Sequence, residues 1–114
     1  SLYEMRATSA DGVAVAYRTQ PNPKKGTLNF WTEAIENHMV KERRYTLEAS
    51  KEATSQTGRP ARLMTYHVTR KGTEFTYVIC LYVTDGEVIV AEAGGKSNAL
   101  AERAGAVRES LLSL

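Results

Sequence analysis

The clearest chemical signature in the sequence is the stretch VIVAEAGGKSNALAER, from Val88 to Arg103. An apolar run leads through two glycines and Gly-Lys-Ser into a helical pattern, as at the end of a phosphate-binding loop. A Walker A loop, however, needs another glycine five residues before the Gly of Gly-Lys-Ser, and Val90 occupies that position. The Asp85-Gly86 turn also predicts an antiparallel neighbour, whereas nucleotide-binding loops of this type occur in parallel sheets. We therefore interpret the stretch as the corner between the last strand and the last helix.

The other reactive side chains do not form a catalytic set. Cys80 lies in the apolar run TYVICLYV, which predicts a buried thiol of raised pKa and low reactivity. His38 and His67 are the two histidines, and their spacing does not supply the three protein ligands that a catalytic zinc needs. We expect no metal, no cofactor and no enzymatic activity.

Tyrosines and basic residues provide the candidate binding groups. Tyr66, Tyr77 and Tyr82 cluster on the predicted hairpins and suit either core packing or a pocket between sheet and helix. The 15 basic and 13 acidic residues give a net charge of +2 and are scattered, so we expect no nucleic-acid partner. The loops QPNPKKG and KEATSQTGRP, with the residues that follow, supply a candidate docking surface for a protein: Lys24, Lys25, Arg59 and Arg62.

Two tight turns predict the sheet that positions these residues. Lys71-Gly72 and Asp85-Gly86 suit two-residue hairpins, which set the register of three consecutive strands within 61–93. The registers that follow are listed here: Val68 opposite Phe75, Tyr66 opposite Tyr77, Met64 opposite Ile79, His67 opposite Thr76, Thr65 opposite Val78, Leu63 opposite Cys80, Val83 opposite Val88 and Leu81 opposite Val90. The strand Thr73 to Thr84 is apolar on both faces, which requires a layer above and a layer below it.

Two helices supply those layers. The segment TLNFWTEAIENHMVKER carries an apolar stripe of Leu28, Trp31, Ile35 and Met39, with Thr27 or Asn29 as its cap. The segment SNALAERAGAVRESLLSL is expected to be one helix, whose stripe comprises Leu100, Ala104, Val107, Leu111 and Leu114. Gly105 within it predicts close packing on the sheet, since glycine costs a helix about 1 kcal/mol relative to alanine.

The rest of the chain adds further strands. The first 20 residues predict a hairpin turning near Ala10-Asp11-Gly12, and Pro21 and Pro23 predict an irregular loop after it. Alternation at Tyr45, Leu47 and Ala49 predicts another strand. We thus expect a single domain, 1–114, of the α+β class. It is an α/β/α sandwich with a mostly antiparallel sheet of five to six strands, two main helices and the order β-β-α-β-β-β-β-α.

This pattern resembles the PsbP-like family. The matching stretches, which together cover most of the chain, are ADGVAVAYR, GTLNFWTEAIENHMVKERRY, TGRPARLMTY, YVICLYVTDGEVIVAEAGG and the closing SLLSL. The resemblance implies an α/β/α sandwich and a role in docking onto other proteins, because PsbP is an extrinsic photosystem subunit and an import factor of similar fold binds a small GTPase. It transfers no catalytic residues.

Two main functional readings follow. The first is a non-catalytic protein-binding or assembly module with an unidentified protein partner, a monomer or weak dimer. The resemblance places it among exported bacterial proteins, periplasmic or held by a lipid anchor upstream of Ser1, with the cytoplasm as the alternative. The second is a small-molecule-binding protein or enzyme with the tyrosine-lined pocket. A regulatory domain of a longer protein is a third reading. No apolar run approaches the ~20 residues of a membrane span.

Overall fold

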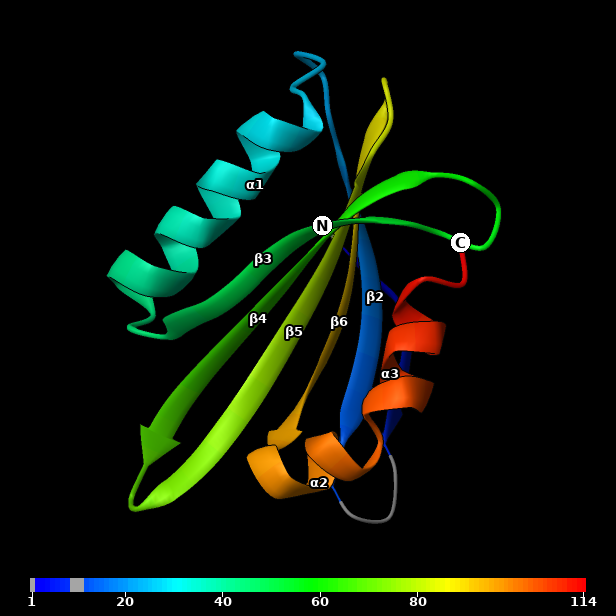
Figure 1. Ribbon diagram of the computed structural model, residues 1–114. Helices are drawn as coiled ribbons and strands as arrows, with labels where there is room; N and C mark the ends of the chain where they lie inside the picture. Colours follow the sequence, from blue (N-terminus) through cyan, green and yellow to red (C-terminus); the bar gives the residue numbers. More distant parts are fainter. Residues whose placement is uncertain (1, 9–11) are drawn as a thin grey trace.

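Helices cover the two faces of an antiparallel sheet in the computed structural model, which describes residues 2–8 and 12–114 (Figure 1). The strands are β1 (Leu2–Thr8), β2 (Ala14–Pro21), β3 (Thr46–Thr54), β4 (Pro60–Arg70), β5 (Thr73–Val83) and β6 (Glu87–Lys96). The helices are α1 (Leu28–Asn37), the π-helix η1 (His38–Glu42), α2 (Ser97–Glu102) and α3 (Ala104–Leu111). The predicted α+β class with a mostly antiparallel sheet is therefore confirmed.

Strands β2 to β6 lie in the order β2-β6-β5-β4-β3, and β1 pairs with the outer edge of β2. All neighbouring strands are antiparallel. The predicted turn at Ala10-Asp11-Gly12 falls largely on residues 9–11, outside the described residues. Gly12, just after them, has a φ of +86°, which glycine adopts without strain.

The two hairpin registers are confirmed pair by pair. Tyr66 lies opposite Tyr77 and Leu63 opposite Cys80 across the first turn, and the other four predicted pairs there agree. Across the second turn, Val83 lies opposite Val88 and Leu81 opposite Val90, as predicted. A two-residue turn determines its register locally, which explains why these pairings follow from the sequence.

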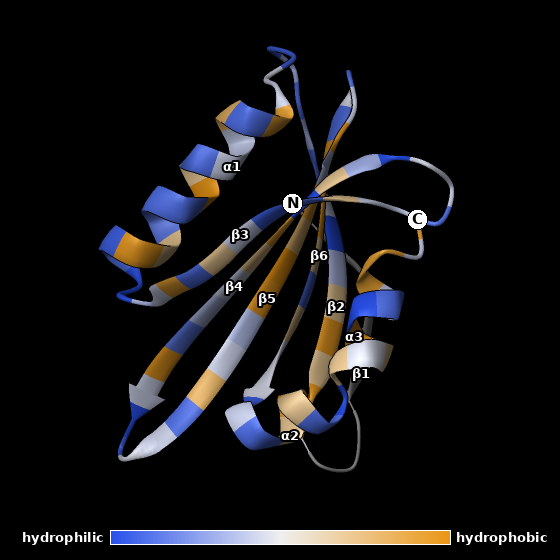
Figure 2. Cartoon of the chain, viewed as in Figure 1, coloured by the Kyte–Doolittle hydropathy of each residue, from blue (hydrophilic) through white to orange (hydrophobic). Residues whose placement is uncertain are grey.

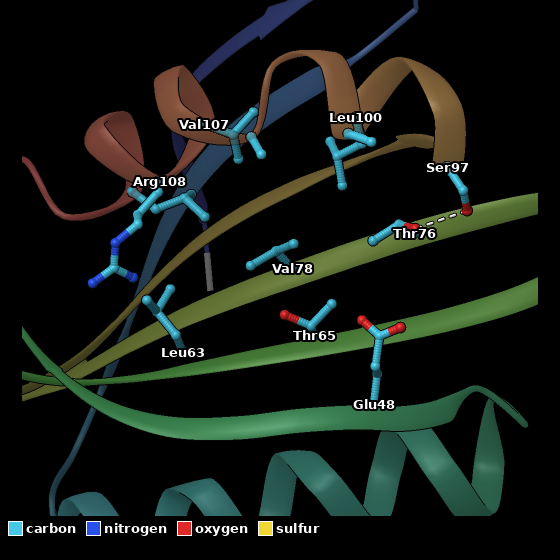
Figure 3. A pocket seen from close by; sticks show the side chains of 12 residues that line it. Glu48, Leu63, Thr65, Thr76, Val78, Ser97, Leu100, Val107 and Arg108 are labelled. Atoms are coloured by element: carbon cyan, nitrogen blue, oxygen red, sulfur yellow. Dashed lines mark hydrogen bonds between the residues drawn. The ribbon is translucent and has the colours of Figure 1, made fainter.

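Strand β3 departs from the predicted alternation. A β-bulge between Leu47 and Ala49 places Leu47 opposite Tyr66 and Ala49 opposite Thr65, two adjacent residues of β4. Leu47 and Ala49 therefore face opposite sides of the sheet, because an extra residue in one strand reverses the alternation beyond it. The bulged residue is Glu48, whose side chain lies on the face that α2 and α3 cover (Figure 3).

Helix α1 begins as predicted and ends differently. Thr27 caps it by accepting a hydrogen bond of 3.1 Å from the backbone N–H of Phe30. Its stripe packs on the sheet, with Met39 3% exposed and Leu28, Trp31 and Ile35 against the same core. The predicted helix extends to Arg43, whereas the α-helical geometry ends at Asn37 and the chain continues as a π-helix.

The expected single C-terminal helix is two short helices, which corrects the predicted element order. The helix is interrupted at Arg103, whose φ of −112° and ψ of 15° lie outside the helical range. Gly105 has no atom within 4 Å of the position a Cβ would occupy, so the expectation that it packs closely on the sheet was wrong. Pro21 also belongs to β2 as its last residue, opposite Glu87, where the sequence predicted a loop.

The two faces of the sheet build separate cores. Met64, Tyr66 and Ile79 pack with α1 and η1 on one face. On the other face, Cys80 and Tyr82 pack with the C-terminal helices. Figure 2 shows the hydrophobic residues gathered on the middle strands while much of α1 is hydrophilic. Helices α2 and α3 pack on β5 and β6 and leave the β3 and β4 side of their face without a covering helix.

The Gly-Gly-Lys-Ser stretch is a corner, as interpreted from the sequence. Gly94, Gly95 and Lys96 lie in β6, and Ser97 begins α2. A Cβ on Gly94 would approach Tyr77 Cδ1 to 2.9 Å, and one on Gly95 would approach the Gly12 carbonyl oxygen to 3.2 Å. Close packing within the sheet therefore accounts for both glycines.

Candidate functional site

The β2–α1 loop lies at the end of the sheet where the β3–β4 loop and the β5–β6 turn also lie (Figure 1). Asn22 holds this loop in place and is 2% exposed. Its Nδ2 donates to the carbonyl oxygens of Gly26 at 3.0 Å and Thr84 at 3.1 Å. Its Oδ1 accepts from the N–H of Gly26 at 2.8 Å and from Trp31 Nε1 at 3.1 Å. One side chain thus joins the loop to α1 and to the β5–β6 turn.

Gly26 completes this arrangement. A Cβ at Gly26 would approach Trp31 Nε1 to 2.7 Å, closer than side chains come to one another without displacement. Glycine therefore allows the indole N–H to reach Asn22 Oδ1. The backbone N–H of Lys25 adds a hydrogen bond of 3.1 Å to the Asn22 carbonyl oxygen. These hydrogen bonds hold the loop against α1 and the β5–β6 turn, although the loop has no regular secondary structure.

A shallow cavity of about 550 Å³ lies on this loop, lined by Asn22, Pro23, Lys24, Lys25, Gly26, Thr27, Phe30 and Trp31. Phe30 is 56% exposed and, over residues 12–114, is one of two large apolar side chains that are exposed. Its ring meets the Trp31 ring edge to face, with centroids 5.5 Å apart. The main surface feature of this end of the molecule is therefore an exposed aromatic ring in the first turn of α1, which lines a cavity together with Lys24 and Lys25.

The structure places two of the four predicted docking residues in this cavity, and the other two lie outside its lining. Lys24 and Lys25 line the cavity, and Arg62 donates from Nη2 to Asn29 Oδ1 at 2.9 Å, beside the start of α1. Arg62 is only half-exposed, so it supports the surface more than it presents charge. Arg59 lies apart in the β3–β4 loop, where neighbouring residues bind the C-terminal segment through Gln56 and Thr57.

A second concavity, a groove of about 340 Å³, lies between the C-terminal helices and the uncovered part of the sheet (Figure 3). Its lining is mostly apolar, and it comprises Glu48, Leu63, Thr65, Thr76, Val78, Ser97, Leu100, Ala101, Ala104, Val107, Arg108 and Leu111. At one end of the groove, the hydroxyl groups of Thr76 and Ser97 form a hydrogen bond, with their oxygens 2.7 Å apart. The groove has walls from β3, β4 and β5 on one side and α2 and α3 on the other.

The prediction of a pocket lined by Tyr66, Tyr77 and Tyr82 is wrong, because the three side chains do not point toward a common space. Tyr66 and Tyr82 are 0% and 1% exposed and lie in opposite cores. Tyr82 donates its hydroxyl to the Leu111 carbonyl oxygen at 2.6 Å, while Tyr66 donates to Met64 Sδ at 3.4 Å. Tyr77 packs on the face of Tyr66, and none of the three lines either concavity. Alternation along β5 sends residues 77 and 82 to different faces.

The remaining reactive residues occupy structural positions. Cys80 is fully buried, and its burial raises the thiol pKa to about 11, against the lowering effects of a hydrogen bond with Tyr82 and of the Arg108 charge. Burial also raises the pKa of Tyr66 to about 12. His38 Nδ1 pairs with Glu42 Oε2 at 3.3 Å on the surface. Over residues 2–8 and 12–114, no three His, Cys, Asp or Glu residues gather into a group suited to a metal ion.

Sequence reasoning missed Asn22, the groove and the ion pair between Arg18 and Glu92. Asn22 was hidden in an irregular loop, although an Asn between two prolines does indicate a side chain that bonds to the turn backbone. Glu92 is 7% exposed and lies 3.4 Å from Arg18 Nε, an arrangement that depends on β2 pairing with β6. That pairing joins strands far apart in the chain and has no local signal.

Comparison with known proteins shows similarity to solved structures. No protein-family model matches the chain, and no curated protein does. Among solved structures, the chain is similar to PA94 from Pseudomonas aeruginosa, a protein of unknown function suggested to be a regulator. The TM-score is 0.64 at 13% identity, over 96% of this chain and 78% of that one. Among the described residues, no helix is long and apolar enough to span a membrane. The likeness shows a shared fold.

Proposed function

We propose that the protein is a non-catalytic binding module that docks onto a partner protein through the cavity on the β2–α1 loop. The observation that carries this proposal is Phe30, which exposes 56% of its surface from a loop and helix that are otherwise tightly bonded. Aromatic side chains in such positions often contribute much of the binding energy of an interface. A preformed loop also loses little conformational entropy on binding.

The charges beside Phe30 define the partner. Lys24 and Lys25 line the same cavity, and no hydrogen bond or ion pair joins either side chain to another described residue. An interface that buries Phe30 brings these ammonium groups to its rim, where acidic residues favour association. The partner that fits is therefore a protein segment with an apolar side chain for the cavity and carboxylates around it.

The rest of the functional proposal comes from resemblance. Docking without catalysis agrees with the role of the PsbP-like family, which we propose as the wider relationship of this chain. An exported bacterial protein, periplasmic or lipid-anchored, belongs to the same proposal. A regulatory role of the kind suggested for PA94 is compatible with docking, since a module without its own chemistry acts through the partner it engages.

Selective loss of binding tests the proposal. The immobilised protein is incubated with extract of the cells that produce it, beside the variant Phe30→Ser and the double variant Lys24→Glu/Lys25→Glu. Val40→Ser is the matched control, because Val40 is the other exposed large apolar residue over residues 12–114, at 37%, and lies on η1 at the far end of α1. Heat-unfolded protein controls for nonspecific retention.

We expect the wild type and Val40→Ser to retain a partner in stoichiometric amount. Phe30→Ser and Lys24→Glu/Lys25→Glu should not retain it. Its binding should weaken as salt rises, because exposed charges are screened. Equal retention by Phe30→Ser, or retention of nothing above the unfolded control, would contradict docking through this surface.

A further inference from the structure

The groove of Figure 3 has opposite charges at its two sides and an apolar floor between them. Arg108 reaches it from α3, and Glu48 reaches it from β3 on the opposite side. Leu63, Val78 and Leu100 provide apolar surface between these two groups. Neither charged side chain forms a hydrogen bond or ion pair with another side chain of the part of the chain that the structure describes. Both charges therefore remain available to an occupant of the groove.

The β-bulge determines which residues after Glu48 lie on the same side of the sheet as Glu48. Without the extra residue, alternation after Leu47 would direct residue 48 to the groove and residue 49 to the α1 side; with it, both Glu48 and Ala49 belong to the groove side. The register also places Lys51 opposite Leu63, which lies near Arg108 in Figure 3. Positive charge thus gathers at the Leu63 end, and the carboxylate of Glu48 lies beside Thr65, toward the other end.

The uncovered part of the sheet supplies the space. Because α2 and α3 pack on β5 and β6, Leu63, Thr65 and Val78 on this face are only partly buried. A volume of about 340 Å³ is at the lower end of the range for small-molecule sites. An apolar chain in this groove would remove partly exposed aliphatic surface from water, which favours binding.

We propose that this groove binds a linear small molecule with an apolar chain, a carboxylate at one end and an ammonium group at the other. The carboxylate pairs with Arg108 and the ammonium with Glu48, and the methylene chain covers Leu63 and Val78. This site is separate from the Phe30 cavity, and its occupation does not depend on the docking proposal. The ligand class follows from the two unpaired charges, since a simple fatty acid would place its apolar end beside the Glu48 carboxylate.

The test uses a matched set of probes: 8-aminooctanoate, octanoate and octylamine, with the 6- and 10-carbon amino acids as a length series. Binding is followed by two-dimensional NMR of the labelled protein, which also shows where each probe binds. We expect at least one of the amino acids to shift the amide signals of Val78, Leu100 and Val107. It should bind about threefold or more tightly than the acid and the amine of the same length, because each exposed ion pair contributes up to about fivefold.

Charge reversal provides the decisive control. Arg108→Glu and Glu48→Lys should each weaken binding of the amino acid about threefold to tenfold, since each places like charges together. The double variant Arg108→Glu/Glu48→Lys should recover binding, because the same probe fits with its ends exchanged. Thermal unfolding verifies that each variant is folded; both positions are exposed. Absence of binding for the whole series, equal binding of octanoate, shifts outside the groove, or no recovery in the double variant would overturn the proposal.

Discussion

Replacing Asn22 with alanine removes four side-chain hydrogen bonds that organise the docking surface, to the N–H and carbonyl of Gly26, the carbonyl of Thr84 and the indole N–H of Trp31. A typical intramolecular hydrogen bond contributes about 0.5–1.5 kcal/mol net, and water can reach some of the freed groups. We therefore expect Asn22→Ala to lower the free energy of unfolding by about 3 kcal/mol. For a domain of this size, that corresponds to a decrease in Tm of about 12 °C.

Urea unfolding followed by fluorescence measures this loss. Trp31 is the single tryptophan, so its emission reports both global unfolding and the loss of its own hydrogen bond to Asn22. We expect the midpoint to fall while the m-value stays constant, because the folded and unfolded states keep their exposed areas. Asn37→Ala is the matched control: Asn37 is exposed at the end of α1, and its side chain forms no cap hydrogen bond. The two variants unfolding at the same urea concentration would refute the role assigned to Asn22.

Three further predictions concern the cores. Cys80 should not react with Ellman's reagent in the native protein. The thiol pKa is 9.0 in the unfolded state and about 11 in the folded state, so the folded state holds the proton more tightly. The contribution of Cys80 to the free energy of unfolding should therefore be fully present below pH 9 and be lost as the pH rises from 9 to 11. Cys80→Ala should flatten the dependence of the free energy of unfolding on pH in this range. Rapid reaction of the native thiol with Ellman's reagent would contradict the buried position of Cys80. Gly94→Ala should lower the free energy of unfolding by about 1–3 kcal/mol, because the added methyl group contacts Tyr77. Gly105→Ala should raise the free energy of unfolding by about 0.5–1 kcal/mol, because alanine favours the helix and has space there. Urea midpoints of the two variants that move in the same direction would contradict this contrast. Tyr82→Phe should lower the Tm by several degrees by leaving the Leu111 carbonyl without its hydrogen bond, and an unchanged melting curve would exclude a stabilising role for it.

The parts of the fold that depend on short-range chemistry followed from the sequence. The turns at Lys71-Gly72 and Asp85-Gly86 determined eight strand pairs, and Thr27 marked the start of α1. Lys71 does adopt a positive φ of 50°, as its tight turn requires, and Gly72 follows at 80°. Each of these features is decided by residues within a few positions of one another, where intrinsic preferences are strong.

The features that escaped prediction depend on contacts distant in the chain. The pairing of β2 with β6 brings Arg18 to Glu92, and no local pattern indicates it. No glycine or proline in the sequence marks the bulge at Glu48, yet the bulge places Ala49 on the groove side of the sheet. The break at Arg103 lies inside a sequence with good helical periodicity, so packing on the sheet overrides propensity there.

The candidate sites show the same division. Lys24 and Lys25 were identified from charge in a proline-containing loop, and they do lie on a concave surface. The exposure of Phe30 was not predictable, because its neighbour Trp31 is the aromatic residue on the apolar stripe and helical periodicity alone does not show how far an off-stripe ring projects into water. The tyrosine pocket was wrong because residues 77 and 82 lie on opposite faces of β5.

Photo-crosslinking from position 30 tests the central claim most directly. A benzoyl-substituted phenylalanine replaces Phe30 in one protein and Val40 in another, and both are irradiated in extract of the producing cells. The account predicts a specific adduct from position 30, absent from position 40, in which the crosslinked peptide carries an apolar residue flanked by acidic ones. Adducts from position 40 alone, or equal adducts from both positions, would contradict docking through the Phe30 surface.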